Sequence, residues 1–142
     1  MKTLLTAGLF YMAIALPSSA LAVPHAGADK ATSTPGNYPA ETLLDTSQDV
    51  LGAELTYPDC KPRIVTKIIS MAPGQTGSEH QHLTPLFAYV LKGALSVSYK
   101  TGVVKVYLAG EAFMEAEHVM HHGFNASDSP ATLLAVYMLC AE

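Results

Sequence analysis

The sequence predicts an all-β fold: a single small domain built as an antiparallel jelly-roll barrel. From about residue 60 onward, short strand-forming segments recur roughly every 8 to 12 positions, with Gly or Pro between most of them. No segment in this region has the apolar spacing of a long helix, so crossover helices are not expected. A small barrel of this kind has an interior wide enough for one small ligand or a metal ion.

Composition and alternation predict the individual strands. Residues 63–71 are rich in β-branched side chains and lie between Pro62 and Pro73. Residues 95–100 alternate strictly between apolar and polar, which predicts a strand with one buried face. Apolar runs bounded by turn residues predict four further strands, at residues 86–91, 103–108, 111–115 and 131–140. Residues 41–51 favour a short amphipathic helical segment.

The N-terminus has the parts of a secretory signal peptide. Lys2 precedes an apolar run from Leu4 to Leu16, and the small residues that follow suit cleavage after Ala22. The run is shorter than the ~20 residues of a membrane span, so a buried N-terminal helix is the alternative. We expect a signal peptide (1–22), a flexible leader (23–40) and a folded domain (41–142), in a periplasmic or secreted protein with no membrane span after cleavage.

Composition and charge exclude two broad classes of protein. The chain has 142 residues, of which 49% are hydrophobic and 14% charged, so it does not resemble a disordered protein. Lys and Arg total 8 against 12 Asp and Glu, which leaves no basic surface for phosphates, and no nucleic-acid partner is expected. Nucleotide-binding loops and the serine-hydrolase elbow are also absent from the sequence.

Cys60 and Cys140 would both remain after signal cleavage. An oxidising compartment would allow a disulfide, which would close a loop of about 80 residues and contribute ~4 kcal/mol in chain-entropy models. Two independent, half-buried thiols are the alternative. The sequence leaves both open, because it does not give the distance between the two Cα atoms.

Five of the six histidines lie between positions 80 and 122, and this clustering is the strongest chemical signal in the chain. His80 and His82 are two residues apart, so on a strand both imidazoles point to the same face and can reach one metal ion. His121 is the natural third ligand. His118 and His122 belong to the same second group. Without further context, His80 and His82 could equally be surface residues at a polar strand edge.

The sequence around these histidines resembles the two motifs of the cupin superfamily. Residues 73–82 (PGQTGSEHQH), followed by YVLKG at 89–93, are similar to the first motif. Residues 110–125 are similar to the second motif, with three positions in register: Gly110, His121 and Asn125. The resemblance covers roughly residues 60–140 and is strongest to small exported cupins with RmlC-like jelly rolls.

This resemblance implies a divalent transition metal (iron first, otherwise manganese, zinc, nickel or copper) bound by His80, His82 and His121. It also implies a homodimer formed through a sheet edge. The sequence departs from the family pattern at two places. Leu86 stands where the family has a metal-binding Glu, and Ala116 and His118 replace the Pro and Gly of the second motif.

Glu115 and His118 are the candidate catalytic residues. If Phe113 fills the barrel, Glu115 points inward on the same face, where a buried carboxylate needs a metal, a histidine or a hydrogen-bond donor as partner. It could then be a further ligand or a general base. A solvated acidic turn shared with Glu117 is the alternative. His118 is expected at the mouth of the barrel, whereas His122 is expected to face away from the metal.

These observations favour an exported metal-binding cupin that acts, as an Fe(II)-type dioxygenase or related enzyme, on a small organic substrate. In that scheme Glu115 or His118 moves protons. The alternative function is a non-enzymatic periplasmic protein that binds or senses a metal or a small ligand. A third interpretation is a structural cupin whose site has decayed, with the missing Glu at position 86 as its first sign.

Overall fold

The computed structural model describes residues 39–142, so the predicted signal peptide and most of the predicted leader lie outside the described residues. Seven strands make up the regular structure of this part of the chain: β1 (Pro62–Met71), β2 (Leu86–Lys92), β3 (Ala94–Tyr99), β4 (Val104–Leu108), β5 (Ala112–Met114), β6 (His121–Phe124) and β7 (Ala131–Cys140). Within residues 39–142, no helix is long and apolar enough to cross a membrane.

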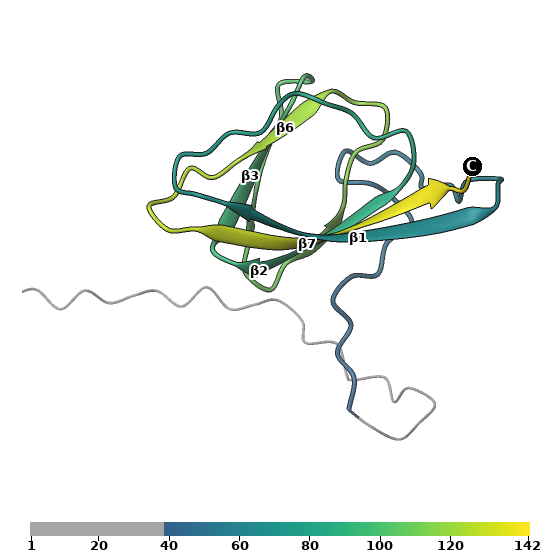
Figure 1. Ribbon diagram of the computed structural model, residues 1–142, viewed down its shortest axis with the longest axis horizontal. Coiled ribbons are helices and arrows are strands. Elements are labelled where there is room, and N and C mark those ends of the chain that lie inside the picture. Colours follow the sequence, from purple (N-terminus) through teal and green to yellow (C-terminus); the bar gives the residue numbers. More distant parts are fainter. Residues whose placement is uncertain (1–38) are drawn as a thin grey trace, which may run out of the picture. The chain divides into compact units, whose positions relative to one another are not determined.

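The strands form two antiparallel sheets, as the jelly-roll prediction requires. The larger sheet has the order β1-β7-β2-β5 and the smaller has the order β4-β3-β6. Figure 1 shows the sheets as facing layers, with β1, β7 and β2 in one layer and β3 and β6 in the other. The first and last strands pair over their whole length, from Pro62 opposite Cys140 to Met71 opposite Ala131.

The inner faces of the two sheets form the core, because alternate residues of each strand point inward. In β2 these are Leu86, Ala88 and Val90, and in β3 they include Leu95 and Val97, all of them buried. The strict alternation of residues 95–100 therefore predicted the buried face of β3 correctly. The core does not fill the whole space between the sheets, and the cavity that remains lies beside the histidines.

Six strands agree with the sequence prediction to within one residue at each end. The helical segment expected at residues 41–51 is wrong, because this stretch contains no helix. Its turn is stabilised by Asp49, whose Oδ1 accepts hydrogen bonds from the backbone N–H groups of Leu51 (2.8 Å) and Ala53 (3.0 Å). An Asp side chain that binds nearby N–H groups in this way competes with helix formation.

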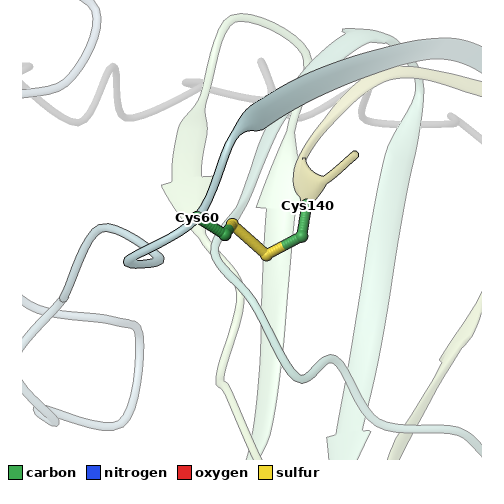
Figure 2. The surroundings of a disulfide bond; sticks show 2 residues. All are labelled: Cys60 and Cys140. Carbon is green, nitrogen blue, oxygen red and sulfur yellow. A yellow bond between two sulfur atoms is a disulfide. The ribbon is translucent and has the colours of Figure 1, made fainter. Parts of the chain in front are cut away.

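The two cysteines form a disulfide, which decides between the alternatives that the sequence left open. The Cα atoms of Cys60 and Cys140 are 5.7 Å apart, within the usual range for a disulfide. Figure 2 shows the bond joining the chain just before β1 to the end of β7. It therefore fastens together the two strands that form one wall of the cavity.

Candidate metal centre

The His80–His82 segment is held in place by backbone bonds to the second histidine group. His80 and His121 exchange a reciprocal pair of N–H···O bonds of 2.9 and 2.8 Å, and the N–H of His118 donates to the carbonyl of His82 at 2.8 Å. The segment forms isolated β-bridges with this group and is not part of a regular strand. Alternation still applies in an extended chain, so both imidazoles point the same way.

The three predicted ligands converge. The ring centroids of His80, His82 and His121 lie 4.6 to 5.0 Å from one another. One ligand nitrogen from each ring can be chosen so that all three lie within 4.8 Å of one another. Ligands that share an ion at a bond length of about 2.1 Å lie roughly 3–4 Å apart, so small side-chain rotations complete the set.

Hydrogen bonds orient two of these rings for metal binding. The Nδ1 atom of His80 lies 2.9 Å from the carbonyl oxygen of Ser78, and Nδ1 of His121 lies 2.8 Å from that of Val119. Each Nδ1–H donates to its carbonyl, which leaves the Nε2 lone pair free to bind a metal. Burial, followed by the proximity of His121 and His80, lowers the pKa of His82 to about 4, so its ring is neutral at pH 7.

Glu115 is buried beside this centre, with an exposed fraction of 5%. Its Oε1 accepts hydrogen bonds from the Tyr99 hydroxyl at 2.5 Å and from the Ala116 N–H at 2.9 Å. Its Oε2 lies 3.8 Å from Nε2 of His121. Burial, and then the charge of Glu115, raise the pKa of Tyr99, so its phenol stays protonated and donates. The alternative of a solvated acidic turn is wrong for Glu115.

Leu86 and Glu115 are cross-strand neighbours. The β2–β5 pairing places Phe87 opposite Met114, so the next pair along the ladder is Leu86 and Glu115, and the N–H of Glu115 donates to the Leu86 carbonyl at 2.8 Å. Directly opposite residues share a face of the sheet. Both side chains accordingly line the same cavity.

The three histidines open onto a cavity of about 220 Å³ between the sheets. Apart from the histidines and Glu115, its wall is mainly apolar, with contributions from both sheets such as Leu86, Ala88, Val97, Phe113 and Leu133. The volume is below the roughly 300–1,000 Å³ of sites for drug-sized ligands, so the cavity suits a small molecule with an apolar body.

The other candidate residues lie outside the cavity wall. His118 is exposed and has a φ of 58°, in the left-handed region that favours glycine. It does not line the cavity, and its catalytic role stays a prediction. His122 is half-buried on β6. Asn125 serves the turn, because its amide donates to the carbonyls of Met71 (3.2 Å) and Ser129 (2.8 Å).

Tyr99 was not predicted to be part of the site. The signal was present, because the strict alternation of residues 95–100 places Tyr99 on the buried face of β3. A buried phenol normally finds a hydrogen-bond partner, and the inward-pointing Glu115 was the acceptor available. The Tyr99 ring also packs in a tilted arrangement against His121, a candidate metal ligand, at 5.6 Å between centroids.

The family of the chain follows from comparison with known sequences. The family model described as the cupin domain matches residues 67–137, and the chain therefore belongs to the cupin superfamily. The match includes all three histidines and the strand residues that line the cavity. No curated protein matches the sequence.

Solved structures are similar to part of this chain. A protein of Bacillus halodurans has a TM-score of 0.50 at 15% identity and covers 56% of this chain and 64% of its own. An RmlC-like cupin of Shewanella frigidimarina has 26% identity, a TM-score of 0.47, and coverage of 56% and 68%. A cupin-superfamily sugar phosphate isomerase of Silicibacter pomeroyi has 22% identity and a TM-score of 0.47. Its alignment covers 54% of this chain and only 50% of the isomerase.

Proposed function

We propose that this protein is an exported cupin whose three histidines hold a divalent transition metal, iron first, for dioxygenase-like oxidation of a small organic substrate in the adjoining cavity. The observation that carries the proposal is the convergence of His80, His82 and His121 from two distant parts of the chain, with their ligand atoms within 4.8 Å of one another. Neutral imidazoles suit iron, zinc, copper and nickel alike, so the three histidines are suitable ligands for the proposed metal ion.

The residues around such an ion would have different roles. Three neutral ligands leave coordination positions open, and an iron(II) ion bound there would supply the capacity to activate dioxygen. The apolar wall excludes water and encloses the body of the substrate. Glu115, held at Oε1 by Tyr99, keeps its Oε2 near His121, where it can accept a proton from a bound substrate or water.

Metal content is the direct test. The mature protein, purified from its own compartment, is expected to hold close to one equivalent of metal by elemental analysis. His82→Ala removes a ligand and is expected to lose most of it. His122→Ala is the matched control, since it removes a half-buried histidine next to a ligand and is expected to keep the metal. Equal metal content in the three proteins would contradict the proposal.

A non-enzymatic metal- or ligand-binding protein is the second candidate function. The observation that favours it is the arrangement of Glu115, whose Oε1 is already engaged with two donors while the rest of the cavity wall is mainly apolar. Oxygen uptake separates the two functions. The iron-loaded protein is expected to consume dioxygen with at least one class of phenol, diketone or thiol. Substrate binding without uptake would favour the binding protein.

Export and self-association belong to the same proposal. The disulfide supports export, because such bonds persist in oxidising compartments and are rare in reducing ones. N-terminal sequencing of the mature protein is expected to begin at Val23, and an intact Met1 in the purified protein would contradict export by signal cleavage.

Light scattering after size exclusion is expected to give the mass of a homodimer, and a monomer mass would refute the dimer.

A further inference from the structure

Lys67 lies on β1, on the side of the strand that faces the cavity, although it is not itself part of the cavity wall. It pairs directly with Ala135 of β7, and its neighbour along that face, Ile69, pairs with Leu133. Ala135, Leu133 and Ile69 all line the cavity. Because directly opposite residues share a face of the sheet, the Lys67 side chain leaves the backbone on the cavity side while remaining exposed to solvent.

An aromatic ring connects this lysine with the metal ligands. The Lys67 ammonium lies over the Tyr137 ring, 4.8 Å from its centroid, and the Tyr137 ring packs edge-on against His82 at 5.9 Å between centroids. Both Tyr137 and His82 line the cavity. Together the two distances place the ammonium within about 11 Å of the His82 ring, a span that a small organic molecule can bridge.

The charge of Lys67 is not neutralised by an acidic neighbour in the described part of the chain. The salt bridges found within residues 39–142 join Lys100 to Glu79 and His121 to Glu115, and neither involves Lys67. The protein as a whole has a net charge of −4. A metal ion at the histidines, with the Lys67 ammonium within about 11 Å of the His82 ring, would make this region positive on an otherwise acidic protein, which attracts anions.

We propose that Lys67 is a specificity-determining residue, and that the substrate is a small organic carboxylate whose apolar body enters the cavity and whose acidic group pairs with the Lys67 ammonium. A single ammonium suits a monoanionic carboxylate. A phosphate carries a larger charge, and phosphate sites usually add backbone N–H donors or further cations to a single Lys. This inference rests on the proposed metal site, since the metal is what holds the reacting end of the substrate.

Benzoate and benzamide test the inference, because they have the same shape and differ in charge. Calorimetric titration of the zinc-loaded protein is expected to show benzoate binding at least fivefold tighter than benzamide. Lys67→Met is expected to weaken benzoate binding by fivefold or more and to leave benzamide within twofold. Lys67→Arg, which keeps the charge, is expected to retain most of the difference. Lys92→Met, an exposed lysine on β2 outside the cavity wall, is the matched control and is expected to match wild type.

Measuring the metal content of the same samples separates failure of the metal site from failure of the proposed role of Lys67. If wild type holds no zinc, the proposed metal site fails. If zinc is bound but Lys67→Met binds benzoate as Lys92→Met does, the metal site stands and the role of Lys67 is refuted. Failure of the zinc-loaded protein to bind benzoate at millimolar concentration also refutes it. Tighter binding of phenyl phosphate than of benzoate would overturn the assignment to carboxylates.

Discussion

Replacing His118 by glycine is expected to stabilise the protein, although it removes a histidine next to the candidate site. The backbone of His118 has a φ of 58°, where a β-carbon costs an ordinary residue about 1–2 kcal/mol. His tolerates this region better than most residues, which favours the lower end of that range. Glycine removes the clash but adds about 0.5–1 kcal/mol of backbone entropy to the unfolded chain. A net gain of at most about 0.5 kcal/mol remains.

Urea unfolding of the metal-free protein measures this gain, and His118→Ala is the control. Alanine removes the same exposed imidazole but keeps the β-carbon, so its stability is expected to equal that of wild type or to fall slightly below it. For a domain of this size, a gain of 0.5 kcal/mol raises Tm by about 2–4 °C. If His118→Gly proves no more stable than His118→Ala, the backbone conformation at this position is not strained by a β-carbon.

The same pair of variants tests the predicted catalytic role. The bond from position 118 to His82 is made by the backbone N–H, so both variants are expected to retain the metal. If the imidazole of His118 moves protons, both variants lose oxygen uptake while metal content stays at the wild-type level. A His118→Gly protein that is more stable and fully active would show that His118 has no catalytic role.

Two further predictions concern stability and use the same unfolding measurement. The Cys60–Cys140 disulfide closes a loop with a sequence separation of 80 residues. Replacing both cysteines by serine is expected to cost about 4 kcal/mol, and a loss below about 1 kcal/mol would contradict the loop-closure argument. Tyr99→Phe removes a buried donor to a carboxylate and is expected to cost about 1.5–3 kcal/mol. Tyr107→Phe is the matched control. It is expected to cost less, because the buried Tyr107 hydroxyl makes no hydrogen bond to a charged group in the described part of the chain and has only the neutral Tyr99 hydroxyl nearby. Equal losses in the two variants would argue against the Tyr99–Glu115 bond.

Most of the fold could be predicted because strand formation in this chain follows local pattern. Strand β6 (His121–Phe124) was missed because its four residues, His-His-Gly-Phe, carry no alternation and include a glycine. Its extended form comes from pairing with β3, where Tyr99 lies opposite His121 and Ser96 opposite Phe124. Such long-range pairing leaves no signal in a short segment taken alone.

The convergence of the three histidines could be predicted because their spacing and the family resemblance agree. The alternation of side chains along an extended chain placed His80 and His82 on one face, and the resemblance to the second cupin motif indicated His121. The partner of Glu115 could not be predicted in the same way. Parity shows that Glu115 and Tyr99 both point inward, but the packing of two different sheets decides that they meet.

The departure from the family pattern at Leu86 does not remove the acidic group from the interior. Glu115 lies directly across the β2–β5 ladder from Leu86, on the same face and against the same cavity. Glu115, which directly follows β5, has one carboxylate oxygen 3.8 Å from His121, while Tyr99 donates a hydrogen bond to the other oxygen. A divalent ion held by three neutral rings would keep its full charge, and a buried carboxylate nearby would compensate part of it. The missing Glu is therefore weak support for a decayed site, because its chemical function can be supplied from the neighbouring strand.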